Sequence, residues 1–211
     1  MEETRVSFLS GGLVMEGILA VPESTGPFPA VIVCHPHPLY GGSMDNNVVN
    51  SISETLAQAS FASLKFNFRG VGASQGEFGQ EIGGQEDVEA AISFICTVKG
   101  IDAKRIGLAG YSAGAGFGFP VGFKDARVKA LAAVSPPLSM FDFDFLGNCR
   151  KPKLLISGSR DDLILADYFL EFCQKLPEPK ECEIIEGADH FWWGYESDLT
   201  DKVTAFFARV L

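Results

Sequence analysis

Continuous apolar runs alternate with segments of helical periodicity along most of this chain. The run Ala30-Val31-Ile32-Val33-Cys34 is typical of a strand buried on both faces of a parallel sheet. The segment 46–59 follows it, with apolar side chains at helical spacing, and we expect a helix there. The same alternation predicts strands at 61–66, 105–109, 128–134, 153–157 and 181–185, and helices at 85–98, 165–176 and 195–210.

The N-terminal part has a different pattern. Residues 6–9 and 13–21 predict two antiparallel strands separated by Gly11-Gly12. An antiparallel pair followed by strand–helix units predicts an α/β fold, with a mostly parallel central sheet and helices on both faces. With 211 residues, no internal repeat and no linker, the sequence predicts one domain over residues 1–211. Pro120 lies inside the helix expected after residue 112, so we expect that helix to be short or kinked.

Composition narrows the class of protein. The chain is 46% hydrophobic and 21% charged, which is typical of a folded globular protein. It lacks a run of about 18 apolar residues, and its acidic first residues do not resemble a secretory signal, so we expect neither a membrane span nor export. The formal charge of −10 argues against nucleic acid and anionic membranes as partners, and the sequence leaves a homodimer open. A cytoplasmic location with reduced thiols is favoured by five scattered cysteines without a CxxC pair: Cys34, Cys96, Cys149, Cys173 and Cys182.

The segment Gly110-Tyr111-Ser112-Ala113-Gly114 carries the strongest chemical signal. It follows the strand expected at 105–109 and precedes small residues that let a helix start close to the sheet. This is the G-x-S-x-G nucleophile elbow, in which a tight strand-to-helix turn exposes the serine hydroxyl. We therefore expect Ser112 to be a catalytic nucleophile, the alternative being a glycine-rich packing turn.

An acid and a base follow two later strands. Asp161 comes after the strand at 153–157 and His190 after the last strand, so both are expected at the sheet edge that carries Ser112. A serine hydroxyl needs a base to take its proton, and a carboxylate fixes the imidazole tautomer. We expect Asp161 rather than Asp162 to be the acid, because its spacing from the preceding glycine directs it toward the histidine loop. A surface histidine is the alternative role for His190.

The loop after the strand at 30–34 is a candidate oxyanion hole. In this architecture one backbone N–H comes from this loop and another from the residue after the nucleophile, here Ala113. The prolines in the loop cannot donate, so His37 is the first candidate donor, followed by Leu39 or Tyr40. A metal site at His35 and His37 is the alternative, but no third ligand has suitable spacing. We expect no metal and no organic cofactor.

A second loop, residues 67–76, follows the strand at 61–66. It contains glycines but neither a phosphate-binding P-loop pattern nor a helix start directly behind Gly70-Val71-Gly72. The phosphate-site interpretation therefore fails, and the remaining interpretation is a tight structural loop. We expect Arg69 to pair with Asp87 or Glu86 and to hold the loop beside the active edge.

These motifs together resemble the α/β-hydrolase fold over essentially the whole chain. The segments His35-Pro36-His37-Pro38-Leu39-Tyr40-Gly41-Gly42 and Asn67-Phe68-Arg69-Gly70 resemble small lidless bacterial-type hydrolases near the dienelactone hydrolase and carboxylesterase families. The resemblance implies a triad of Ser112, Asp161 and His190 and an oxyanion hole from the amides of His37 and Ala113. Dienelactone hydrolases proper have cysteine at the elbow, so the serine here indicates simple ester hydrolysis.

The segment between the strands at 128–134 and 153–157 is too short for the cap domain of many lipases. It is rich in aromatic residues and is expected to form part of an acyl pocket, although ordinary core packing is the alternative for each aromatic side chain. The expected pocket residues are Tyr40, Phe117, Met140, Phe141, Trp192 and Trp193.

The sequence therefore predicts a serine carboxylesterase acting on short- to medium-chain esters through an acyl-enzyme on Ser112. The partner is then a small-molecule ester. A thioesterase or a peptidase-like acyl hydrolase is the alternative among enzymes, because the same site accepts any reactive acyl carbon. A non-catalytic ligand-binding member of the fold is the alternative outside enzymes.

Overall fold

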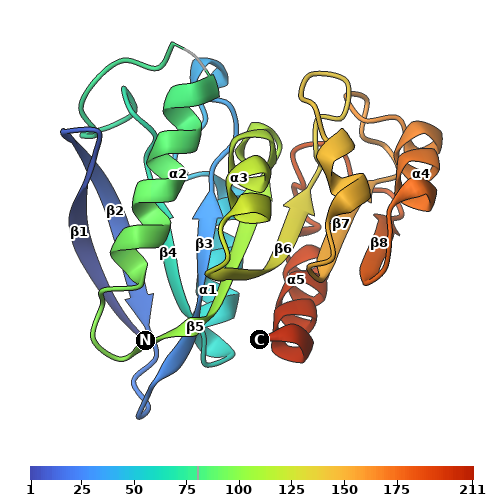
Figure 1. The fold of residues 1–211 in the computed structure, drawn as a ribbon. Coiled ribbons are helices and arrows are strands. Elements are labelled where there is room, and N and C mark those ends of the chain that lie inside the picture. Colours follow the sequence, from blue (N-terminus) through green and yellow to red (C-terminus); the bar gives the residue numbers. More distant parts are fainter. Residues whose placement is uncertain (80) are drawn as a thin grey trace.

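The computed structural model describes residues 1–79 and 81–211, and it contains one eight-stranded sheet (Figure 1). The strand order is β1-β2-β4-β3-β5-β6-β7-β8. The β1–β2 and β2–β4 pairs are antiparallel, and every other neighbouring pair is parallel. The strands are β1 (Glu2–Ser10), β2 (Leu13–Val21), β3 (Phe28–Cys34), β4 (Ala62–Phe66), β5 (Ile101–Tyr111), β6 (Val128–Val134), β7 (Lys153–Gly158) and β8 (Lys180–Ile185).

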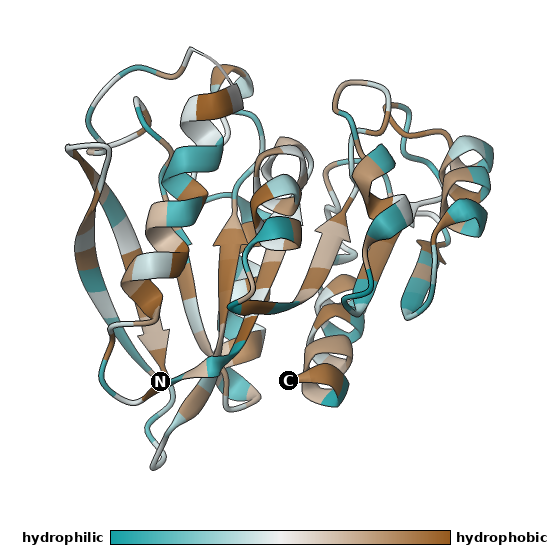
Figure 2. Ribbon diagram, viewed as in Figure 1, coloured by the Kyte–Doolittle hydropathy of each residue, from teal (hydrophilic) through white to brown (hydrophobic). Residues whose placement is uncertain are grey.

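Helices cover both faces of the sheet. On one face lie α2 (Glu81–Ile95), α3 (Ala113–Lys124) and α4 (Ala166–Lys175), and on the other α1 (Asn47–Gln58) and α5 (Glu196–Val210) (Figure 1). The continuous apolar run of β3 follows from this arrangement, because alternate residues of a strand enter opposite cores. Ile32 packs in the core under α2 and α3, and Val33 in the core under α1 and α5. The hydrophobic colouring of the central strands in Figure 2 reflects this burial on both sides.

The parallel strands end in register at one edge of the sheet. Cys34 at the end of β3 lies opposite Gly110 of β5, and Tyr111 lies opposite Val134 at the end of β6. This edge, at the top in Figure 1, gathers the loops that follow the central strands.

The fold prediction is confirmed in its element types, their order and the mixed sheet. We expected the helix after Ser112 to be short or kinked at Pro120, and the first of these alternatives was wrong: α3 continues through Pro120 to Lys124. A proline inside a helix removes one N–H donor, here the one that would bond Gly116, but packing of α3 against the sheet keeps the helix intact. Between β6 and β7 the chain forms only the short 3₁₀-helix η2 (Asp144–Asn148), so no cap domain is inserted there. Within the described residues, no helix has the length and apolar character needed to span a membrane.

Candidate active site

Ser112 lies in a strained turn between β5 and α3. Its φ of 51° and ψ of −124° are rare for a residue other than glycine, and such strain concentrates at functional sites. The turn is held by the Ser112 N–H, which donates to the Val134 carbonyl at 2.8 Å, and by the Ala115 N–H, which donates to the Ser112 carbonyl at 2.9 Å. A Cβ at Gly114 would lie 2.3 Å from the Cys34 carbonyl oxygen, so only glycine fits between the elbow and β3.

Three side chains from separate loops form one hydrogen-bonded chain at this edge. His190 Nε2 lies 3.1 Å from Ser112 Oγ, and His190 Nδ1 lies 2.9 Å from Asp161 Oδ2. Asp161 is 4% exposed and His190 is 7% exposed. The N–H groups of Leu163 and Ile164 both donate to Asp161 Oδ1 at 3.0 Å, which fixes the carboxylate against the imidazole. The arrangement presents Nε2 to the serine hydroxyl as a proton acceptor.

The structure distinguishes the two neighbouring aspartates. Asp161 faces His190, whereas Asp162 is exposed to solvent and has no hydrogen bond to the imidazole. Asp161, the acid expected from the sequence, is therefore the carboxylate that contacts the imidazole.

Tyr111, the residue before the serine, has a role that the sequence analysis missed. Its hydroxyl donates to the backbone carbonyl of His190 at 2.7 Å and so ties the histidine loop to β5. Burial, with a smaller effect from the charges of Asp161 and Asp189, raises the pKa of Tyr111, so the phenol remains a donor. Its place inside the elbow pattern was the only signal in the sequence.

The amides of His37 and Ala113 are available to an oxyanion. Neither N–H donates to an acceptor within the described part of the chain. The rival candidates are occupied: the Leu39 N–H donates to His37 Nδ1 at 3.2 Å, and the Tyr40 N–H donates to the His37 carbonyl at 3.0 Å. The geometry therefore favours His37 over Leu39 and Tyr40 as the donor of this loop.

His35 is fully buried and makes two hydrogen bonds, one as a donor and one as an acceptor. Its Nδ1 lies 2.7 Å from the Pro36 carbonyl, and its Nε2 lies 3.1 Å from the Phe68 N–H. A carbonyl can only accept and an N–H can only donate, so the ring is neutral with its proton on Nδ1. Burial lowers the pKa of His35 to about 4, in agreement with this tautomer. Both ring nitrogens are occupied, and among the described residues no cluster of three His, Cys, Asp or Glu could hold a metal.

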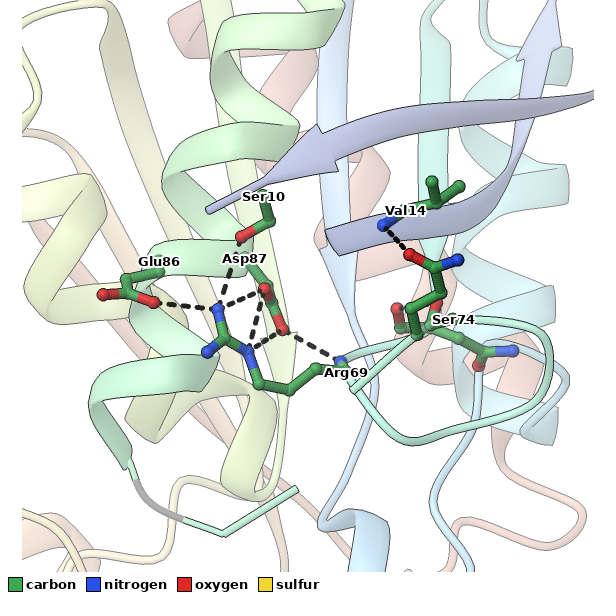
Figure 3. Close-up of polar contacts among 8 residues, drawn as sticks. Ser10, Val14, Arg69, Ser74, Glu86 and Asp87 are labelled. Atoms are coloured by element: carbon green, nitrogen blue, oxygen red, sulfur yellow. Dashed lines mark hydrogen bonds and ion pairs between the residues drawn. The ribbon is translucent and has the colours of Figure 1, made fainter. Parts of the chain in front are cut away.

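The expected pairing of Arg69 is confirmed with both acids (Figure 3). The Arg69 guanidinium donates to both carboxylate oxygens of the buried Asp87 and to Glu86 Oε2 at 2.9 Å. The Arg69 backbone N–H also donates to Asp87 Oδ2 at 2.9 Å. The acids raise the pKa of Arg69, and the largest cause is the hydrogen bonding of its guanidinium to Asp87. The loop 67–76 is therefore joined to α2 by a charged network.

A mostly apolar cavity of about 520 Å³ opens at Ser112. Of the expected pocket residues, Tyr40, Met140 and Phe141 line it. Phe117 lies instead under an adjacent hollow of about 240 Å³, which shares His37, Met140 and Phe141 with the main cavity. Lining residues that the sequence analysis missed are Pro36, Gly41, Gly42, Asn46, Tyr111, Pro137, Leu163 and Phe191.

Neither tryptophan lines the cavity, so that expectation was wrong. Trp192 is 0% exposed, belongs to the core under α1 and α5, and donates from Nε1 to Ser135 Oγ at 3.1 Å. Trp193 is 69% exposed and is not among the residues that line the cavity. The positive φ of 63° at Trp192 turns the chain, and the neighbouring Phe191 faces the cavity instead.

Comparison with known proteins identifies the family and the fold. The profile of the X-Pro dipeptidyl-peptidase (S15) family matches residues 11–159, which is more than half of the chain. The chain belongs to the S15 family. An uncharacterized relative, RP471 of Rickettsia prowazekii, is 33% identical over 172 residues, which cover 78% of this chain and 72% of that protein. The chain spans only about half the length of several other curated relatives that it matches.

Two solved structures define the fold of this S15 member. An α/β serine hydrolase homologue from Coxiella burnetii is 29% identical with a TM-score of 0.88, covering 97% of each chain. XC6422 from Xanthomonas campestris, described as an α/β serine hydrolase without a lid, is 25% identical with a TM-score of 0.82, covering 99% of this chain and 95% of that one. The protein therefore has the lidless α/β-hydrolase fold, and its resemblance to small hydrolases of this kind is confirmed.

Proposed function

We propose that this S15 member is a serine carboxylesterase that hydrolyses esters with short to medium apolar acyl groups. The observation that carries the proposal is the hydrogen-bonded chain from Ser112 Oγ through His190 to Asp161, next to two amides that have no acceptor among the described residues. A pure ligand-binding protein has no chemical need for this combination.

The geometry supports a two-step acyl transfer. Ser112 Oγ attacks the ester carbonyl while His190 Nε2 takes its proton, and the oxyanion accepts hydrogen bonds from the amides of His37 and Ala113. His190 then gives the proton to the leaving alcohol, which departs and leaves the acyl group on Ser112. Water then attacks the acyl carbon and loses a proton to His190, the bond between the acyl carbon and Ser112 Oγ breaks, and His190 returns the proton to Ser112 Oγ as the carboxylic acid leaves. Asp161 stabilises the imidazolium in both steps.

The same geometry supports a placement for the two parts of the proposed substrate. The leaving oxygen must reach His190 Nε2, so the alcohol lies on the side of the cavity near His190 and Phe191. The acyl group then extends toward Met140 and Phe141, and the hollow above Phe117 lies on that side. Apolar walls and open access favour a small or medium acyl group over a long lipid chain.

Two other acyl transfers are less well supported. Release of a dipeptide requires recognition of a free α-ammonium group, but no carboxylate is present among the described residues that line either hollow. Thioesters fit the same site chemically, but the protein's charge of −10 opposes a polyanionic thiol. We also propose a cytoplasmic location, which is supported by five free cysteines in the described chain.

One experiment tests the function directly. We expect a fluorophosphonate probe to label the wild-type protein and not Ser112→Ala, and p-nitrophenyl butanoate turnover to disappear in the same variant. A series of p-nitrophenyl esters should peak between butanoate and octanoate, with glycyl-prolyl-p-nitroanilide and butanoyl-CoA hydrolysed more slowly. Labelling that persists in Ser112→Ala, or peak activity at hexadecanoate, contradicts the proposal.

A further inference from the structure

Asn67 begins the loop after β4 and makes buried polar contacts that the reaction steps above do not involve. Its side chain is 3% exposed. Asn67 Oδ1 accepts the Met44 N–H at 2.8 Å, and Asn67 Nδ2 donates to Glu16 Oε1 at 2.7 Å. Met44 lies at the far end of the loop that contains His37, so Asn67 links that end of the loop to β2.

The near end of the same loop is held by the next residue, Phe68. The Phe68 N–H donates to His35 Nε2, and His35 Nδ1 donates to the Pro36 carbonyl. The Pro36 carbonyl and the His37 N–H belong to one planar trans peptide unit, so they point in opposite directions. Holding the carbonyl oxygen on His35 therefore fixes the direction of the N–H that faces the oxyanion.

The loop 67–76 is itself fixed to its surroundings. Arg69 bonds Asp87 and Glu86 of α2 (Figure 3). Ser74 Oγ donates to the Asn67 carbonyl at 2.7 Å and accepts the Glu16 N–H at 3.0 Å. The Val14 N–H donates to Gln75 Oε1 at 2.9 Å, and the Gln75 N–H donates to the Val14 carbonyl at 2.8 Å. The hydrogen bonds from Asn67 and Phe68 therefore start from a rigid base.

We propose that His35 and Asn67 are positioning residues that clamp both ends of the segment 36–44 and thereby aim the His37 N–H at the oxyanion. The role of the clamp in catalysis rests on the proposed function. Neither residue touches the substrate. The loop 67–76 connects β2 and α2 to the segment 36–44, which carries the His37 N–H of the oxyanion hole.

The test compares two clamp variants with a matched buried-polar control. His35→Phe keeps an aromatic ring that can contact the edge of Phe68, as His35 does, but removes both hydrogen bonds. Asn67→Ala removes the acceptor for the Met44 N–H. Ser63→Ala, on the strand that leads into the loop, breaks the buried Ser53–Ser63 hydroxyl pair at 2.7 Å without touching the clamp. His35→Gln, whose amide can still accept from Phe68, serves as the conservative rescue.

The decisive readout is a rate ratio: kcat for p-nitrophenyl butanoate divided by kcat for its thiono (C=S) analogue. Sulfur accepts hydrogen bonds weakly, so the thiono rate depends little on the aim of the donor. We expect both clamp variants to lower kcat for the oxygen ester by about 10- to 100-fold, with KM nearly unchanged and the ratio falling at least about fivefold. Ser63→Ala should keep the wild-type ratio, His35→Gln should recover part of it, and Asp161→Asn should lower both rates together. Folded clamp variants with the wild-type ratio contradict the proposal.

Hydrogen exchange separates the clamp from the esterase activity. Asn67→Ala should speed exchange across 36–45, with protection in β5 and β6 unchanged, and Ser63→Ala should leave that segment protected. If the wild type hydrolyses no ester, the esterase proposal fails, while exchange still decides whether the clamp exists. Unchanged exchange in Asn67→Ala rejects the clamp whatever the activity.

Discussion

At the scale of single residues, the environment of Asp161 decides which of two adjacent carboxylates orients the imidazole. Asp161 Oδ1 is occupied by the amides of Leu163 and Ile164, and both carboxylate oxygens lie close to His190 Nδ1. An acceptor held in this way keeps the Nδ1 proton in place and leaves Nε2 free to accept from Ser112.

Asp161→Asn is therefore expected to inactivate the enzyme without unfolding it. The Asn oxygen can still accept from Leu163 and Ile164, but the amide NH₂ then faces Nδ1 and favours the wrong tautomer. We expect kcat for p-nitrophenyl butanoate to fall by about 10³- to 10⁴-fold at nearly constant KM. Asp162→Asn is the control and should retain wild-type kinetics. An equal loss in both variants would show that the carboxylates act through general charge rather than through this contact.

The adjacent residues Phe191, Trp192 and Trp193 show what the sequence leaves open at this scale. All three are large and aromatic, and their order does not tell which one faces the cavity. Which side chain faces the cavity is set by the positive φ of Trp192 and by its hydrogen bond to Ser135, a residue 57 positions away along the chain. Polar motif residues were easier to predict, because the ends of parallel strands place Ser112, Asp161 and His190 at one edge.

At the scale of elements, strands and helices were predictable where burial is uniform. The apolar run of β3 identified a central strand because both of its faces are covered. The position of β4 between β2 and β3 was not predictable, because the pairing depends on contacts between segments far apart in sequence. A short α3, one of the two alternatives expected from Pro120, was wrong for a related reason: packing of α3 against the sheet outweighs the single hydrogen bond lost at Pro120.

The connection between the loop 67–76 and α2 is expected to depend on Asp87 far more than on Glu86. The Asp87 side chain is 0% exposed and accepts from both the guanidinium and the backbone of Arg69, whereas Glu86 is 53% exposed. Asp87→Ala leaves a mostly buried guanidinium short of a partner and should cost about 3 kcal/mol of unfolding free energy. Glu86→Ala should cost less than about 1 kcal/mol. Urea unfolding measures both, and equal costs would place the stabilising contact elsewhere.

At the scale of the whole molecule, the short connection between β6 and β7 leaves the active edge uncovered. Tyr40, Met140 and Phe191 are well exposed around the mouth of the cavity. Because the connection between β6 and β7 forms no cap over the cavity, the reacting carbonyl must be positioned by the sheet edge and by the loops bonded to it. The hydrogen bonds of His35 belong to that edge, and they also connect the site to the stability of the fold.

Folding stability is therefore expected to fall on mild acidification through His35. Its pKa is lowered from 6.5 to about 4 in the folded protein, with burial as the main cause. Between these values the unfolded chain binds a proton that the folded protein does not, so the unfolding free energy decreases as pH falls. The loss should reach about 2 kcal/mol between about pH 7 and about pH 5.

His35→Gln has no titrating group at this position and isolates the effect. Its unfolding free energy should change less over the same interval, and the difference between the two slopes measures His35 alone, because His37, His190 and the carboxylates are common to both proteins. Chemical unfolding at several pH values gives both curves. Parallel curves would mean that the buried imidazole gains its proton as readily in the folded protein as in the unfolded chain, which is incompatible with an Nε2 that accepts from the Phe68 N–H.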